Sequence, residues 1–202
     1  MQSFWNERYS QDEYVYGESP NEWLKECLAG LTPGKILFPA EGEGRNAVYA
    51  AQCDWEVEAF DYSDAGKRKA EQLARRNGVR IHYQVADARD VQFPEASFDA
   101  IAMIFTHFPE PMRNEIFPRW IQWLKPGGVL ILECFSVGQL AYQQEHGSGG
   151  PREPQLLYTL DTIRDEFPGM DPSVLEEREV MLQEGAFHAG LGKVIRLIGV
   201  KR

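Results

Sequence analysis

The stretch from residue 35 to residue 61 limits most strongly what this chain can fold into. A short apolar run, Lys35 to Pro39, leads into a turn that carries Gly42 and Gly44. A helix-like pattern follows, and a second apolar run ends at Asp61. Doubly wound α/β folds hold adenosine-bearing cofactors with this order of strand, glycine turn, helix and strand with a terminal acid. Glycine is expected where a cofactor crowds the backbone. The alternative interpretation is an ordinary turn between strand and helix with solvated glutamates.

Two glutamates in this turn, Glu41 and Glu43, discriminate between cofactors. The Gly-x-Gly-x-x-Ala pattern that starts at Gly42 fits a dinucleotide site, and Asp61 lies at about the 20-residue offset of the ribose acid. A pyrophosphate at a helix N-terminus, however, requires amides and positive potential. Two carboxylates would repel it, whereas S-adenosylmethionine has a sulfonium and an ammonium and no phosphate. The turn therefore favours S-adenosylmethionine over a nicotinamide cofactor.

Composition predicts a single domain over residues 1–202. A chain of 202 residues with 43% hydrophobic content can bury one substantial core. Its formal charge of −10, from 31 acids and 21 bases, disfavours a large nucleic-acid footprint. Cys27, Cys53 and Cys134 are scattered without metal-ligand spacing, so we expect reduced cysteines, a cytoplasmic setting and no metal site. No charged leader and no apolar run of membrane length is evident, so no membrane role is expected.

Residues 1–30 are expected to form an N-terminal helical lid. A short helix is predicted at residues 4–9, and a second helix begins with Ser19 as its N-cap. Trp5 and Tyr16 belong to this lid and are candidates for contact with the cofactor. The alternative is that the aromatic residues only cover a hydrophobic face, and the sequence leaves both readings open.

The middle of the chain continues the alternation of strands and helices. Ser63 is expected to cap a helix that ends near Asn77 and Gly78. Further strands are predicted at residues 79–85, 98–105 and 129–135, with a helix at 111–124 that Pro118 should kink. Asp87 and Ala88 follow the third strand, where a carboxylate can accept a hydrogen bond from an adenine amino group; a simple turn is the alternative.

The last third of the chain is predicted to close the sheet. Residues 136–158 carry little periodicity, and such a long connection is usually functional or disordered; we assign it as a substrate-side loop. Thr159 is expected to cap a helix, and alternating runs at 174–182 and 191–200 predict an antiparallel hairpin. The predicted fold is α/β and doubly wound, with a seven-stranded, mostly parallel sheet and an antiparallel C-terminal hairpin.

Several motifs, taken in order, carry a family resemblance. The turn from Glu41 to Gly44, the run Phe98-Asp99-x-Ile101, the turn at residues 124–128 and the final antiparallel pair together resemble a class I S-adenosylmethionine-dependent methyltransferase. The opening aromatic segment and Gly44-Arg45-Asn46-Ala47 are similar to the small-molecule branch that includes tellurite-resistance and thiopurine-type methyltransferases. The likeness covers nearly the whole chain and implies the Rossmann-like methyltransferase fold.

The resemblance also implies roles by position. Residues Ala40 to Gly44 would lie against the methionine part of the cofactor, with Glu41 near its ammonium. Asp61 would hold the ribose, and Phe105 would line the sulfonium end. The remaining positions would contact the cofactor carboxylate (Arg45, Asn46), flank the adenine (Tyr62) and meet its polar edge (Asp87, Ala88). Two positions depart from the pattern, since family members usually carry an acid at Phe38 and glycine at Ala40. We expect weakened but surviving cofactor binding, because Glu41 can supply the missing negative charge.

The reaction implied is in-line methyl transfer to a small-molecule acceptor. An oxygen or nitrogen acceptor needs a base, and His107, at the end of the fourth strand, is the candidate; a helix cap is its alternative role. His188, in the hairpin, is expected to be structural. Two other functions remain open: a catalytically silent S-adenosylmethionine-binding sensor or partner protein and, disfavoured by the acidic turn, an NAD-dependent oxidoreductase. Neither the acceptor nor the oligomeric state follows from the sequence.

Overall fold

A single seven-stranded sheet organises the chain, in the strand order β3-β2-β1-β4-β5-β7-β6. The computed structural model describes residues 2–202; the predicted lid at 1–30 includes Met1, which lies outside them. The first five strands run parallel, and β7 pairs antiparallel with both of its neighbours. The predicted fold class is therefore confirmed. The strands are β1 (Lys35–Pro39), β2 (Glu56–Asp61), β3 (His82–Val85), β4 (Phe98–Ile104), β5 (Leu124–Phe135), β6 (Met170–Glu184) and β7 (His188–Lys201).

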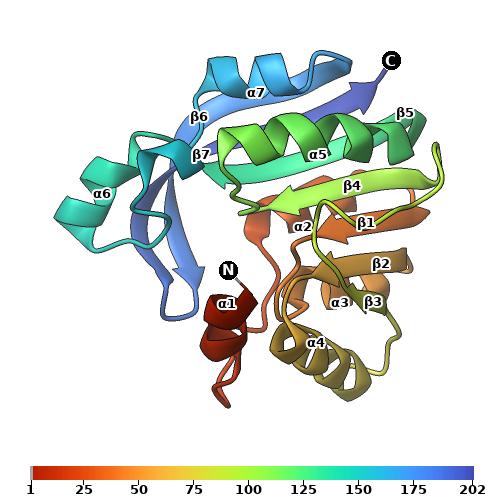
Figure 1. The fold of residues 1–202 in the computed structure, drawn as a ribbon, viewed down its shortest axis with the longest axis horizontal. Helices are drawn as coiled ribbons and strands as arrows, with labels where there is room; N and C mark the ends of the chain where they lie inside the picture. Colours follow the sequence, from red (N-terminus) through yellow and green to blue (C-terminus); the bar gives the residue numbers. More distant parts are fainter. Residues whose placement is uncertain (1) are drawn as a thin grey trace.

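Helices cover both faces of this sheet (Figure 1). They are α1 (Gln2–Tyr9), α2 (Glu22–Ala29), α3 (Arg45–Gln52), α4 (Asp64–Arg76), α5 (Glu110–Trp123), α6 (Gln139–His146), the 3-10 helix η1 (Pro154–Leu156) and α7 (Leu160–Glu166). Side-chain alternation along the strands separates two cores. Leu37 packs with the aromatic residues of α5, whereas Ile36 and Phe38 pack with α2 and α3. Phe38 is fully buried, so the position at which the resemblance implies an acid belongs to the hydrophobic core here.

The caps of three helices test the sequence assignments. The Ser63 side chain accepts from the Gly66 amide at the start of α4, and Thr159 accepts from Thr162 at the start of α7, as predicted. The N-cap predicted for α2 was wrong. Asn21, not Ser19, accepts the capping bond from the Leu24 amide, and the helix begins at Glu22. Both residues are favourable caps, and Asn21 is held in place because its own amide donates to Asn46.

Residues 136–158 are more ordered than their composition indicates. They contain α6 and η1, and Gln139 joins the start of α6 to residues 148–149 and to β7. Its amide nitrogen donates to the Ser148 hydroxyl and the Gly149 carbonyl, and its Oε1 accepts from the Lys193 amide. These bonds fix the segment against β7.

The β6–β7 hairpin is longer than predicted and extends beyond the rest of the sheet. Figure 1 shows its tip beside α1. There, the Ala186 amide donates to the Val15 carbonyl at 3.2 Å, and a Cβ on Gly185 would come within 2.2 Å of the same oxygen. The hairpin tip and the N-terminal segment thus meet above the carboxyl ends of the central strands. Among residues 2–202, no helix has the length and apolar character needed to cross a membrane.

Candidate functional site

The glycine turn after β1 has a left-handed backbone at three positions. The φ angles are +53° at Ala40, +66° at Gly42 and +89° at Gly44. A Cβ on Gly42 would lie 2.7 Å from the Tyr9 hydroxyl, and one on Gly44 would lie 2.4 Å from the Ala70 Cβ. The chain's own α1 and α4 therefore occupy the space beside these glycines. The sequence argument explained both glycines by a crowding ligand, but close packing within the protein already requires them.

Two carboxylates, Glu41 and Asp61, lie at this turn with only backbone donors. One oxygen of Glu41 accepts from the amides of Asn46 and Ala47, at 2.9 and 2.8 Å, at the N-terminus of α3. Asp61 accepts from the Gly42 and Ser63 amides, at 3.1 and 2.9 Å. Neither forms an ion pair within the described chain. Burial raises the pKa of Glu41 to about 7 and that of Asp61 to about 6.

Glu43 points away from this acidic pair. Its carboxylate accepts from the Val15 amide at 2.8 Å and pairs with Lys69 at 2.5 Å. The Lys69 ammonium also donates to the carbonyls of Gln11 and Glu13. The repulsion that the sequence predicts from both glutamates is therefore wrong for Glu43. Lys69 neutralises Glu43, and the repulsive charge at the turn belongs to Glu41 and Asp61.

Arg45 and Asn46 make contacts inside the protein. Arg45 is buried and pairs with Glu184, at the end of β6, at 2.8 Å; it also donates to the Ser19 carbonyl. The Asn46 side chain accepts from the Asn21 amide. Both residues lie beside the turn, as the resemblance implies. In this structure, however, their side chains connect α3 to the N-terminal segment and to the hairpin.

Tyr62, Asp87 and Ala88 lie together at the carboxyl ends of β2 and β3. The Tyr62 hydroxyl hydrogen-bonds to Asp87, and Arg89 binds both oxygens of that carboxylate. The Arg89 guanidinium holds the pKa of Asp87 down at about 2, so this acid remains an acceptor. Ala88 is buried in the core, and its carbonyl accepts from Arg119.

Phe105, directly after β4, has a left-handed backbone with φ of +51°. Its ring packs on those of Phe135 and His188, each with a centroid separation of 4.6 Å. The centroid of the Tyr16 ring also lies 4.6 Å from that of His188. Tyr16, Phe105, Phe135 and His188 thus form an aromatic wall that connects the N-terminal segment, β4, β5 and the hairpin. Trp5 lies farther out, stacked on Tyr9 at 5.4 Å.

His107 is held by the backbone at both ring nitrogens. Its Nδ1 lies 2.7 Å from the Leu156 carbonyl oxygen, so Nδ1 carries the proton, and Nε2 accepts from the Phe135 amide at 3.4 Å. Burial lowers the pKa of His107 to about 4. A ring with both nitrogens occupied and such weak basicity is unfavourable as a base. His107 also makes no capping bond to α5, whose N-cap is Pro109; instead it connects β5 with η1.

Sequence reasoning missed several residues at this site. Tyr83 donates to the Gly42 carbonyl at 2.6 Å, and Glu184 and His188 face each other across the hairpin turn, with Oε2 and Nδ1 3.3 Å apart. The sequence could have indicated the contact between Glu184 and His188, because a hairpin turn at Gly185 places the residues on its two sides opposite one another. Lys69 had no signal, since its partner Glu43 lies on another element.

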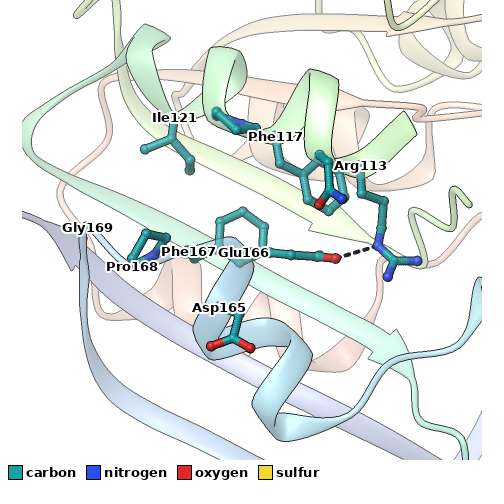
Figure 2. A pocket seen from close by; sticks show the side chains of 10 residues that line it. Arg113, Phe117, Ile121, Asp165, Glu166, Phe167, Pro168 and Gly169 are labelled. Carbon is teal, nitrogen blue, oxygen red and sulfur yellow. Dashed lines mark hydrogen bonds and ion pairs between the residues drawn. The ribbon is translucent and has the colours of Figure 1, made fainter. Parts of the chain in front are cut away.

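A hollow of about 270 Å³ lies between α5 and α7. Figure 2 shows Arg113 and Glu166 joined at one end of it, 2.7 Å apart, with Phe117, Ile121 and Phe167 along its length. None of the residues that line it belongs to the predicted site, and its position on the far side of α5 separates it from the glycine turn.

Comparison with known proteins agrees with this geometry. Residues 36–128, from β1 to the start of β5, match the family described as "Methyltransferase domain". This match and the sheet topology give the chain the class I S-adenosylmethionine-dependent methyltransferase fold. It is 27% identical over 146 residues to 27-O-demethylrifamycin SV methyltransferase of Amycolatopsis mediterranei, covering 67% of this chain and 54% of the relative. It is 29% identical over 116 residues to demethylmenaquinone methyltransferase of Clavibacter sepedonicus, covering 55% and 45%. The chain thus spans about half the length of these curated relatives.

Solved structures share the fold. A protein described with the conversion of a disulfide bond into a thioacetal group during echinomycin biosynthesis superposes with a TM-score of 0.76. The sequence identity is 19%, and the match covers 100% of this chain and 92% of that one. TehB from Haemophilus influenzae gives a TM-score of 0.73 at 12% identity, covering 100% of this chain and 67% of TehB. At these identities, the likeness establishes the methyltransferase fold.

Proposed function

We propose that this methyltransferase-family protein transfers a methyl group from S-adenosylmethionine to a small-molecule acceptor. The observation that carries the proposal is the pair formed by Glu41 and Asp61. Both are carboxylates at the carboxyl ends of neighbouring strands, and both have raised pKa values. Within the described chain neither forms an ion pair; the charge of Arg45, which is paired with Glu184, offsets only part of the effect of burial on Glu41. Such a pair suits a ligand that brings hydroxyl donors and a positive charge, and it disfavours a diphosphate.

The residues at the turn fit this cofactor. Asp61 would accept from the ribose hydroxyls, and Glu41 would face the ammonium while it continues to cap α3. Tyr62, Asp87 and Ala88 would meet the adenine, and Arg45 lies beside the turn, near the position of the cofactor carboxylate. When bound, S-adenosylmethionine supplies a methyl group already activated on a sulfonium. The protein's task is then to align the acceptor and exclude water.

The acceptor side is proposed to be the aromatic wall. The segment 136–158 packs on it: a Cβ on Gly150 would lie 2.8 Å from the Phe135 ring, and one on Gly149 would be 3.0 Å from the His188 ring. This supports the assignment of 136–158 as the substrate-side loop. The hairpin tip and the lid close the same region, which favours a small acceptor, and the net charge of −10 argues against nucleic acid.

Calorimetric titration with S-adenosylhomocysteine, with NAD in parallel, tests the cofactor. We expect micromolar binding of S-adenosylhomocysteine alone. Asp61→Asn should abolish it, because an amide offers only one acceptor oxygen and its nitrogen donates. Asp90→Asn, the same charge change at an exposed position, should leave it unchanged. Binding of NAD but not of S-adenosylhomocysteine would refute the proposal.

A screen of methyl acceptors tests the reaction. The purified protein would be incubated with radiolabelled S-adenosylmethionine and a panel of thiols, phenols, amines, halides and metalloid oxyanions. Turnover of at least one class is expected. Tight cofactor binding without turnover of any class would instead favour a catalytically silent binding protein, a reading for which Phe38 in the core and the strained Ala40 are the relevant observations.

A further inference from the structure

Three charged or titratable side chains form a chain of contacts that ends at His188, a member of the aromatic wall. Arg45 lies 2.8 Å from Glu184 Oε2, and the same oxygen lies 3.3 Å from Nδ1 of His188. Asn21 fixes the other oxygen of Glu184 by donating to it at 2.8 Å. Arg45, Glu184 and His188 each expose about a tenth of the side chain or less. The carboxylate is therefore held at both oxygens, with one of them facing the imidazole.

This arrangement fixes the tautomer of His188. Burial opposes ionisation of Glu184, but Arg45 and His188 hold its pKa down at about 2, so it is a carboxylate at neutral pH. A carboxylate can only accept, so the neutral His188 ring carries its proton on Nδ1. The Nε2 lone pair is then free. Within residues 2–202, Nε2 makes no hydrogen bond, and this atom is not fully buried.

The ring of His188 also lies next to the residue expected at the sulfonium end of the cofactor. It packs between Tyr16 of the lid and Phe105, the residue expected at the sulfonium end of the cofactor. His107 is within the same group of rings, but both of its nitrogens are bonded to the backbone. Of the two histidines near the proposed reaction centre, only His188 offers a free nitrogen.

We propose that His188, oriented by Glu184, is the general base that removes a proton from the methyl acceptor, and that the acceptor is a planar aromatic molecule with an O–H or N–H at its reacting atom. This inference rests on the proposed function. The acceptor's proton moves to Nε2, and its electron pair stays on the acceptor atom, which thereby becomes nucleophilic toward the methyl group. Glu184 stabilises the resulting imidazolium, and the ring then returns the proton to solvent.

The flat aromatic wall is the basis for the acceptor class. Tyr16, Phe105 and Phe135 present ring faces or edges around His188, and such surfaces favour another ring. A soft thiolate needs no base, so a built histidine–carboxylate pair indicates an acceptor that keeps its proton at neutral pH.

The first test examines the ring of His188 in the full-length protein, independent of turnover. Two-bond ¹H–¹⁵N NMR spectra would give the tautomer of each histidine, and carbethoxylation with diethyl pyrocarbonate followed by peptide mass spectrometry would give the accessibility of each ring. We expect the Nδ1–H tautomer at His188 and reaction faster than at His107. His82 and His146, both exposed, serve as references. In Glu184→Gln, the tautomer preference should fall.

The second test uses the acceptor found in the screen. His188→Gln should lower kcat by about 100-fold or more on a phenol probe, with S-adenosylhomocysteine affinity unchanged within about twofold. On 4-nitrothiophenol, which is ionised near neutral pH, the same variant should lose little. The kcat of the wild type should rise with pH as His188 loses its proton. That pH profile also reflects the groups that face the ring, namely Arg8, Tyr16, Arg45, His107 and Glu184.

The outcomes separate the two proposals. Absence of S-adenosylhomocysteine binding or of any turnover contradicts the proposed function, while the NMR result still decides the assignment of His188. An Nε2–H tautomer, carbethoxylation no faster than at His107, or an unchanged kcat on the phenol probe in His188→Gln would each overturn the inference.

Discussion

The two sides of the site bury carboxylates in opposite ways. At the glycine turn, Glu41 and Asp61 accept only from backbone amides, and burial raises both pKa values. At the hairpin, Glu184 is equally enclosed, but Arg45, Asn21 and His188 surround it and its pKa is low. Within the described residues the first pair has no ion-pair partner, whereas the carboxylate of the second is paired with Arg45. We infer that the first is built to bind a ligand and the second to orient a side chain.

The largest effect on stability is expected when Arg45, the cation that pairs with Glu184, is removed. Arg45→Ala leaves Glu184 buried without its charged partner, and breaking a buried pair costs about 3–5 kcal/mol of unfolding free energy. Urea denaturation measures this. The matched control is Arg178→Ala, whose pair with Glu176 is about half exposed on both sides and should contribute less than about 1 kcal/mol. A similar small loss in both variants would contradict the distinction between the two sides.

The free energy of unfolding should change with pH in opposite directions for the carboxylates on the two sides of the site. The folded pKa values of about 7 for Glu41 and about 6 for Asp61 exceed their ordinary values of 4.5 and 3.8. Between about pH 4 and 7, the folded state therefore binds more protons, and unfolding free energy falls as pH rises, by up to about 3 kcal/mol per carboxyl. Glu184, with its pKa lowered from 4.5 to about 2, behaves oppositely, and its contribution is lost as pH falls below about 4.5.

Urea titrations from pH 2 to pH 8 measure both limbs of this profile. Glu41→Gln should reduce the fall in unfolding free energy between pH 4 and 7. Glu184→Gln should reduce the fall that occurs when the pH is lowered below about 4.5. The lowered pKa of His107 raises the unfolding free energy between about pH 4 and 6.5, so the carboxyl effect is measured as the difference between wild type and variant. Parallel profiles of wild type and Glu41→Gln from pH 4 to 8 would show that Glu41 is ionised at little cost.

The smallest effect concerns Ala40. With φ of +53°, Ala40 occupies a conformation that costs a non-glycine residue about 1–2 kcal/mol, partly offset by the greater flexibility of an unfolded glycine. Ala40→Gly should raise stability by about 0.5–1 kcal/mol and also tighten S-adenosylhomocysteine binding, because a methyl group beside the ligand is removed. Ala96→Gly is the control: Ala96 has φ of +50° at an exposed turn, so the stability should rise without a change in affinity. Equal affinity changes in both variants would remove Ala40 from the site.

The sheet could be predicted because its signals are local. Apolar runs of strand length, the glycine turn and the caps Ser63 and Thr159 each act within a few residues, and the structure has all of them. The cap of α2 could not be decided locally. Ser19 and Asn21 are both good caps, and the bond from Asn21 to Asn46 of another helix settles the choice.

The sequence predicted where the candidate site residues lie on the strands, but not the side chains that they contact, and their role toward a cofactor stays a prediction. Ala40 to Gly44, Asp61 and Phe105 lie at the strand ends where the topology places them. The partner of Glu43 could not be foreseen, because Lys69 is brought to it by the packing of α4 against the turn. For the same reason, the sequence favoured His107 over His188. The order of strands places both near the site, and only the hydrogen bonds of each ring reveal which nitrogen is free.

The contacts of Lys69 have a mechanical consequence. Lys69 and Glu43 attach residues 11–16 to α4 and the glycine turn through several buried hydrogen bonds and an ion pair. This part of the N-terminal segment is therefore firmly held against the glycine turn. The hairpin tip meets the same residues through one backbone hydrogen bond and the half-exposed ring of Phe187. The weaker attachment yields first. Opening on this side is therefore expected to be confined to residues 185–187, because Arg45 and Asn21 hold Glu184 in place.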